Sequence, residues 1–378
     1  MIGINASIVG ENPTGLGIYS IKLIQELDRL RRDFCVYSSA PEAFPGLRAS
    51  VLPAPAAGSP GRGAGGHLVR LLWLQSLLRV RARGSRLRLL LNTVPEGILG
   101  SSIPQVTVVH DLLPLAFPPE YPRQQYYFRY FVPRILHSSK VVVTDSEYTR
   151  RAVIDRYGLP SGQVRVVYPG YNPDVYYQSD GLSSNSRLNK GEEYVLYVGN
   201  LLPHKNVLRL LDAVAILRRR RPVRLVIRGE GRPAYARAVR ARVETLGLDG
   251  AVSIRGYTTE RTMRDLYTGA ACLVLPSLGE GFGLPVLEAM ACGTPVVTTR
   301  VASIPEVAGD AAMLVDAHDA IALADALHRV VTDRGLREEL RGRGLLQAKR
   351  FDWAQTAAQM SRLLDTAQAG RFDGAEAG

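Results

Sequence analysis

The chain has 378 residues, of which 46% are hydrophobic and 22% charged, and its formal net charge is +12. This composition excludes disordered and fibrous chains, and at roughly 150 residues per domain the length favours two domains. The basic excess predicts an anionic partner, which could be a nucleic acid, a phosphorylated ligand or an anionic membrane face. The cysteines Cys35, Cys272 and Cys292 lie far apart in apolar surroundings, so a disulfide framework and a zinc site are both excluded. No apolar run approaches the roughly 20 residues of a membrane span and the chain opens directly on a strand pattern, so we expect a cytoplasmic protein.

Short β-branched runs alternate with helical stretches along nearly the whole chain, a pattern typical of parallel sheets covered by helices on both faces. The predicted strands are Ile2–Ile8, Phe34–Ser39, Leu87–Asn92, Val106–Asp111, Val141–Asp145 and Val164–Tyr168, then Tyr194–Val198, Arg224–Ile227, Val252–Gly256, Cys272–Pro276, Pro295–Thr299 and Ala312–Val315. The polar stretch 178–193 between the two sets has no apolar periodicity and is interpreted as a linker. The sequence therefore predicts an α/β protein of two doubly wound, Rossmann-like domains, 1–177 and 194–355, facing each other across a cleft. We expect 356–378 to hold a helix that returns to the first domain, and then a frayed tail.

Two segments near the start of the chain could contact a ligand or a surface. Gly15 and Gly17 follow the first strand, where glycines let the backbone approach a ligand closely, although G-x-G alone also fits any tight turn. From His67 to Arg88, leucines and a tryptophan are backed by arginines. This pattern suits a helix on an anionic lipid surface, or an ordinary helix packed on the first sheet.

His110 and Asp111 end a predicted buried strand. Open parallel sheets bind ligands outside the carboxyl ends of their strands, so this position makes His110 a candidate for holding a hydroxyl or donating a hydrogen bond. Asp111 could orient His110 or form a turn. Ser146 is interpreted as the cap of the following helix.

In the second half, Tyr197–Asn206 predicts a strand end, a loop and the start of a helix that Asn206 can cap. A lysine just ahead of a helix N-terminus suits a pyrophosphate, so Lys205 is the candidate phosphate-binding residue. Arg228, at the end of the next strand, offers a further cation.

The most informative stretch is 276–295, which leaves a buried strand, passes a glycine-rich loop and starts a helix near Pro285 that stops at Gly293. The loop amides and the positive end of the helix dipole suit a phosphate or sugar hydroxyls. The loop residues concerned are Gly281, Phe282, Gly283 and Leu284. Glu280 and Glu288 can face one ligand, although a solvated glutamate next to an amphipathic helix is the simpler alternative.

The run from Glu280, EGFGLPVLEAMACGTPV, resembles the signature of glycosyltransferase family 4, retaining enzymes of the GT-B fold. The resemblance extends over nearly all the chain and is nearest to bacterial mannosyl and rhamnosyl transferases of surface polysaccharide synthesis. It implies that Glu280 lies beside the transferred sugar and that Glu288 holds the ribose hydroxyls of the nucleotide. It also implies that His110 contacts the transferred sugar.

The resemblance extends to the remaining donor contacts, with one departure. The loop of Gly15 and Gly17 would close over the donor phosphate and the acceptor. The family often has an arginine where this chain has Asn200, which removes one expected phosphate charge. Arg228 is our candidate replacement for that charge.

The sequence thus predicts a transferase that moves a hexose or deoxyhexose, with retention, from a nucleoside diphosphate sugar to a glycan or lipid-linked acceptor. GDP-mannose is the first candidate donor and a UDP-sugar the next. No D-x-D sequence is present, so we expect neither a metal nor a cofactor. The basic surface suits an acceptor on the inner membrane face, with the protein peripherally bound.

Two other functions remain open from the sequence. An NAD-dependent Rossmann oxidoreductase is disfavoured because Ser20 stands where the third glycine of G-x-G-x-x-G would be. A nucleic-acid-binding protein is suggested by charge alone, without interleaved aromatic residues, so we expect no nucleic acid partner.

Overall fold

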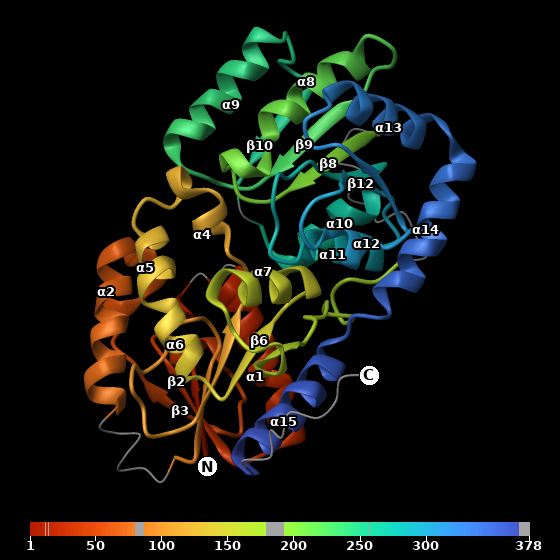
Figure 1. The fold of residues 1–378 in the computed structure, drawn as a ribbon. Helices are drawn as coiled ribbons and strands as arrows, with labels where there is room; N and C mark the ends of the chain where they lie inside the picture. Colours follow the sequence, from red (N-terminus) through yellow and green to blue (C-terminus); the bar gives the residue numbers. More distant parts are fainter. Residues whose placement is uncertain (12, 14, 80–86, 179–192, 257, 370–378) are drawn as a thin grey trace. The chain divides into compact units, whose positions relative to one another are not determined.

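The computed structural model describes residues 1–378 except 12, 14, 80–86, 179–192, 257 and 370–378 (Figure 1). The chain forms two compact units. Unit 1 comprises Met1–Gly170 and Trp353–Gly378, and unit 2 comprises Tyr171–Asp352. The predicted linker, 178–193, lies outside the described residues except for its two end positions. Within the described ranges, no helix is long and apolar enough to cross a membrane.

Unit 1 is built on a parallel seven-stranded sheet of order β3-β2-β1-β4-β5-β6-β7. Its strands are β1 Ile2–Asn5, β2 Phe34–Ser38, β3 Ser50–Pro53, β4 Leu89–Asn92, β5 Gln105–Val109, β6 Val141–Thr144 and β7 Val164–Val166. Its α-helices are α1 Gly15–Leu30, α2 Gly63–Trp73, α4 Leu113–Ala116, α5 Gln124–Tyr130, α6 Val132–Ser138, α7 Glu147–Tyr157 and α15 Trp353–Ala369. The strand order reverses between β1 and β4, and such a switch point is where doubly wound sheets bind ligands.

Helix α15 completes the core of unit 1 although it comes last in the chain. It lies beside α1 (Figure 1), and Trp353 and Met360 are buried in the same apolar cluster as β1 and α1 residues. Thr356 donates a hydrogen bond to the Tyr168 carbonyl at 2.7 Å, and Arg31 at the end of α1 pairs with Asp365. Unit 1 is therefore assembled from both ends of the chain.

Unit 2 contains a parallel six-stranded sheet of order β10-β9-β8-β11-β12-β13. Its strands are β8 Tyr194–Val198, β9 Arg224–Arg228, β10 Val252–Arg255, β11 Cys272–Leu275, β12 Val296–Thr299 and β13 Ala312–Val315. Its α-helices are α8 Val207–Arg218, α9 Pro233–Thr245, α10 Glu260–Gly269, α11 Leu284–Ala291, α12 Ile304–Ala308, α13 Ala320–Thr332 and α14 Arg334–Ala348. The predicted α/β class, with two parallel-sheet units, is confirmed.

The structure differs from the sequence prediction in its strands and in two helices. Strand β3 was not predicted, and β1 ends at Asn5 rather than Ile8. Helix α1 already begins at Gly15, so Gly15 and Gly17 lie in its first turn and not in a loop. The apolar segment predicted from His67 belongs to a helix that begins at Gly63 and continues as one π-helical turn, Leu74–Leu78.

Candidate active site

Lys205 and Glu280 are in direct contact in unit 2. The Lys205 Nζ donates to both carboxylate oxygens of Glu280 at 2.7 Å, and the carboxylate is buried. Ser277 donates a further hydrogen bond to Glu280 Oε1 at 2.6 Å. A lysine ammonium has three donors, so with two directed at Glu280 the third is available to an anionic ligand.

The loop from β11 to α11 fixes the position of Glu280. Ser303 donates to the Phe282 carbonyl at 3.1 Å, and the Phe282 ring packs edge-on against Phe351. Gly283 precedes the helix with φ of 102°, a left-handed conformation that favours glycine, and an added Cβ there would lie 2.7 Å from Ile304. The loop is therefore a rigid support for its carboxylate.

Helix α11 follows this loop as predicted, with Leu284 as its first residue and Pro285 in the first turn. It ends at Ala291, and Gly293 has φ of 72°. Gly281 and Phe282 lie directly ahead of the N-terminus, whose amide groups and dipole attract negative charge. The structure therefore places the predicted glycine-rich loop at a helix N-terminus.

Asn206 differs from its predicted role as a side-chain cap. It precedes α8 with φ of 60°, and its side chain makes no capping hydrogen bond. Instead its Nδ2 donates to the carbonyls of Pro276 and Ala317, at 3.0 and 2.7 Å. Asn206 thus ties the Lys205 loop to the loop that carries Glu280.

Glu288 lies in the second turn of α11 and accepts a hydrogen bond from the Tyr267 hydroxyl at 2.9 Å. Burial raises the pKa of Glu288 to about 7, the hydrogen bond from Tyr267 opposes this shift, and the charge of Glu260 adds to it. Near neutral pH a carboxyl group with this pKa is partly ionised, and the ionised form accepts hydrogen bonds from hydroxyl groups. Glu288 is therefore suited to bind the hydroxyl groups of a ligand.

Asn200 and Arg228 lie at the ends of two adjacent strands, β8 and β9. The backbones approach so closely there that a Cβ on Gly229 would lie 1.8 Å from the Gly199 carbonyl oxygen. Arg228 donates through Nη1 to the Gly256 carbonyl at 3.3 Å, whereas its buried Nε has no hydrogen-bond partner within the described part of the chain. Burial, together with the charge of Arg255, lowers the pKa of Arg228. An anion near Arg228 would relieve this unfavourable burial of positive charge.

In unit 1, His110 is buried at the end of β5 and is held at both ring nitrogens. Nδ1 lies 2.6 Å from Asp145 Oδ2, and Nε2 lies 2.8 Å from the Thr93 carbonyl oxygen. Burial opposes the charged ring, but the charge and the hydrogen bond of Asp145 outweigh it and raise the pKa of His110. Both bonds are satisfied together when the ring carries two protons.

Sequence reasoning missed Asp145 and Tyr19 as neighbours of His110. The Tyr19 ring stands edge-on to His110 with a centroid distance of 4.5 Å. Asp111, which was considered for orienting His110, instead accepts from the Leu113 amide and forms a turn. Ser146 caps α7 as predicted, accepting from the Thr149 amide.

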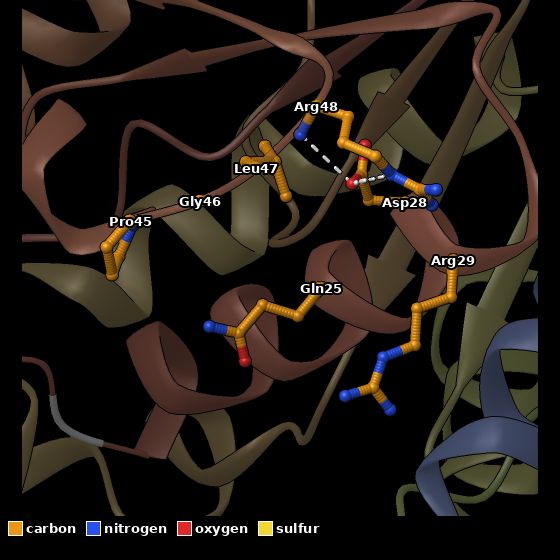
Figure 2. Close-up of a pocket in the computed structure, with 7 residues that line it drawn as sticks. All are labelled: Gln25, Asp28, Arg29, Pro45, Gly46, Leu47 and Arg48. Atoms are coloured by element: carbon orange, nitrogen blue, oxygen red, sulfur yellow. Dashed lines mark hydrogen bonds and ion pairs between the residues drawn. The ribbon is translucent and has the colours of Figure 1, made fainter.

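Two surface hollows lie apart from these residues. The one in Figure 2, of about 540 Å³, lies over the last turns of α1 in unit 1, where Asp28 accepts hydrogen bonds from the backbone and side chain of Arg48. This arrangement ties a connecting loop to α1. The other hollow lies in unit 2, where the Arg264 guanidinium stacks on the Tyr177 ring at 5.0 Å. No site residue predicted from the sequence lines either hollow.

The fold is shared with solved glycosyltransferase structures. Sucrose-phosphate synthase from Thermosynechococcus elongatus is similar with a TM-score of 0.78 at 20% identity, over 98% of this chain and 99% of that one. Anabaena HepE, solved in complex with UDP-glucose, gives a TM-score of 0.77 at 19% identity, over 97% and 99%. The two parallel-sheet α/β units therefore have the GT-B fold.

Sequence comparisons identify the family. The family model described as "Glycosyltransferase Family 4" matches residues 13–175, and the one described as "Glycosyl transferases group 1" matches residues 180–346. The chain is also 31% identical to O-antigen chain mannosyltransferase B of Escherichia coli, over 67% of this chain and 68% of that protein. The chain belongs to glycosyltransferase family 4, as the run from Glu280 indicated.

Other relatives are matched over less of their length. The chain is 31% identical to a D-inositol 3-phosphate glycosyltransferase of a Nocardioides species, over 60% of this chain but 53% of that protein. The match thus spans about half of this relative.

Proposed function

We propose that this glycosyltransferase moves a hexose or deoxyhexose from a nucleoside diphosphate sugar, held by unit 2, to a hydroxyl of a glycan or lipid-linked acceptor, held by unit 1. The observation that carries this proposal is the Lys205–Glu280 contact beside the N-terminus of α11. It provides a cation for a phosphate and, 2.7 Å away, a carboxylate for the adjoining sugar.

The diphosphate is neutralised by the third N–H of Lys205, by the amides of 281–284 and by Arg228. Arg228 takes the place of the arginine that the family often has at the position of Asn200. Its support is the buried Nε, which has no hydrogen-bond partner among the described residues and so carries the cost of burial. Gly15 and Gly17, in the first turn of α1, are proposed to lie against the donor phosphate from unit 1.

The nucleoside is held by Glu288, whose carboxylate accepts hydrogen bonds from the ribose hydroxyls. Its contact with Tyr267 fixes the side chain in one orientation, which lowers the entropy lost on binding. The raised pKa of Glu288 makes this binding dependent on pH near neutrality.

The transfer proceeds with retention, as in the family. The acceptor oxygen attacks the anomeric carbon on the face from which the phosphate departs, the bond from that carbon to the phosphate oxygen breaks, and the hydroxyl proton passes to the departing diphosphate. Glu280 stabilises the positive charge that develops on the sugar. His110 holds a sugar hydroxyl. For its Nε2 to donate a hydrogen bond to that hydroxyl, the hydrogen bond from Nε2 to the Thr93 carbonyl must first break.

GDP-mannose is the proposed donor and a UDP-sugar the second candidate. The similarity to an O-antigen mannosyltransferase supports mannose, and the complex of HepE with UDP-glucose is the reason to keep UDP in the test. We place the protein in the cytoplasm, where its acceptor is presented at the inner membrane face.

The test is thermal stabilisation by GDP, UDP, GDP-mannose and NAD. A ligand at 100 times its dissociation constant adds about 2.7 kcal/mol to the free energy of unfolding, which is a clear shift of the melting temperature. We expect GDP and GDP-mannose to stabilise the protein and NAD to have no effect. Stabilisation by NAD with no response to either diphosphate would favour the oxidoreductase alternative.

A second measurement tests the stereochemistry. We expect the one-bond carbon–proton coupling at the anomeric carbon of the first-formed product to match that of the donor sugar. An inverted product would disprove retention and leave donor binding unaffected.

A further inference from the structure

The segment from His67 presents a much smaller apolar surface than its sequence suggests. Trp73, Leu74 and Leu78 are buried in the core of unit 1, together with strands β2 and β4. Arg70 is buried as well and donates through Nε and Nη2 to the two carboxylate oxygens of Glu96, at 2.9 Å each. Arg81, Arg83 and Arg86 lie outside the described residues. The large apolar side chains that helix α2 leaves exposed are Leu68 and Leu72.

Helix α5 lies beside α2 (Figure 1). The rings of His67 and Tyr127 meet at a centroid distance of 4.8 Å, which fixes the two helices side by side. Tyr126 and Tyr130, four residues apart on one side of α5, are exposed, and Phe131, which follows them, stacks on Tyr127. We call the following five residues the aromatic face, all between 45% and 61% exposed: Leu68, Leu72, Tyr126, Tyr130 and Phe131.

The two segments that carry the aromatic face contain basic residues and no acidic ones. Segments 61–79 and 121–140 contain no Asp or Glu, although the chain has 35 acidic residues. The exposed basic residues of these segments are Arg62, Arg123, Arg129, Arg134 and Lys140. The neighbouring carboxylates of Glu96 and Glu120 are buried, and Glu96 is paired with Arg70. The face is therefore apolar and aromatic within a cationic border.

We propose that the aromatic face binds an anionic lipid bilayer, with Leu68, Leu72 and the aromatic rings among the headgroups and the arginines against lipid phosphates. Tyrosine suits this position because its ring is apolar and its hydroxyl stays hydrated. The cationic border complements an anionic leaflet, and each basic residue near such a surface strengthens binding about fivefold. This inference goes beyond the proposed function, because it needs neither a donor nor a particular acceptor.

The experiment is flotation of the full chain with vesicles of phosphatidylcholine, alone or mixed in equal parts with phosphatidylglycerol. We expect binding that requires phosphatidylglycerol and weakens with added salt. R129E/R134E should weaken binding about 25-fold or more, since two attractive charges are lost and two repulsive ones added. L72S should weaken binding to anionic vesicles and leave its salt dependence unchanged.

Matched controls come from unit 2. R237E/R240E on α9 makes the same charge change at exposed positions, and L346S on α14 makes the same apolar-to-polar change at an exposed position. Both variants should bind vesicles nearly as the unaltered protein does. If R237E/R240E loses as much binding as R129E/R134E, net charge rather than this face binds lipid and the proposal is wrong.

Two other outcomes would also overturn the proposal. One is a protein that ignores anionic vesicles at low salt. The other is a dimer in vesicle-free solution that L72S dissociates, since the face would then join copies of the chain. GDP-induced stabilisation is measured on every variant, so that loss of donor binding is seen separately from loss of lipid binding.

Discussion

Lys205 and Glu280 have different roles in our proposal although they touch, and substitution separates the roles. Lys205→Ala should weaken the binding of a nucleoside diphosphate by about 1.5–3 kcal/mol, the range for a charged hydrogen bond. The bare nucleoside, which lacks the phosphates, should bind almost as before. Calorimetric titration with both ligands measures this, and Lys349→Ala at an exposed site on the same unit is the control. Equal loss for both ligands would mean that Lys205 only supports the loop.

Glu280→Gln tests the other half of the pair. The amide keeps the size of the side chain and an acceptor for Lys205, so nucleotide binding should persist. Turnover should fall strongly, because the negative charge beside the sugar is lost. The measurement is kcat for transfer alongside the dissociation constant of the nucleoside diphosphate. A parallel loss of both would place Glu280 away from the reacting centre.

Glu288 predicts a pH dependence of nucleotide binding. Its pKa in the folded protein is about 7, above the ordinary value of 4.5. Its contribution to the free energy of unfolding is therefore fully present below about pH 4.5 and is lost as the pH rises to about 7. Binding of ribose hydroxyls needs the ionised form, so affinity should fall about tenfold per pH unit below 7. The measurement is the nucleotide affinity of the unaltered protein and of Glu288→Gln at each pH. The difference between the two pH profiles reports on Glu288 alone, because protonation of the ligand phosphate affects both proteins equally. Identical pH profiles would contradict the assignment.

The residues around His110 show what the sequence leaves undetermined at this scale. His110 was predicted because it follows a buried strand, but Asp145 follows another one and was not connected with it. Their contact depends on β5 and β6 being neighbours, with Val109 opposite Thr144. Strand adjacency is a property of the sheet and not of either strand pattern. Asn206 illustrates the same limit, since its acceptors, Pro276 and Ala317, are distant in the sequence.

At the scale of elements, most strands were predicted to within a few residues because buried parallel strands are continuous β-branched runs. Strand β3 is the exception. It is short, largely exposed, ends in Pro53 and lies at the sheet edge, so it has neither the apolar run nor the length that identifies a strand. The π-helical turn after α2 was not predicted either, and its residues Leu74 and Leu78 are buried in the core.

The close approach of β8 and β9 at their carboxyl ends leads to a prediction about how these two strands pack. Gly229→Ala would put a Cβ 1.8 Å from the Gly199 carbonyl oxygen, so the two strand ends must separate. We expect a loss of stability of about 1–3 kcal/mol and weaker diphosphate binding, since Arg228 and Asn200 flank this contact. Thermal unfolding and titration measure the two effects.

Gly342→Ala is the matched control in the same unit. This glycine lies in α14, and an added Cβ there meets nothing within 4 Å. Alanine should leave stability unchanged or raise it, because it favours the helix. A tolerated Gly229→Ala would show that the strand ends separate without cost.

At the scale of the whole molecule, the two units should respond separately to a core substitution in α15. Trp353→Ala removes a buried side chain from the core of unit 1 and should cost about 3–5 kcal/mol. Hydrogen exchange should then show reduced protection in β1 and β4 and unchanged protection in β8 and β11. Leu346→Ala, at an exposed position, is the control and should change neither. Loss of protection throughout the chain would mean that the units unfold as one.

The division of unit 1 between the two ends of the chain affects its synthesis on the ribosome. All of unit 2, residues 171–352, must be translated before α15 exists, and at about 5–20 residues per second this takes roughly 10 to 40 s. During that time the apolar surface that α15 covers, including residues of α1, is open to water and to other nascent chains. The first unit to begin synthesis is thus the last to be completed, and this interval is when the nascent chain most needs protection from aggregation.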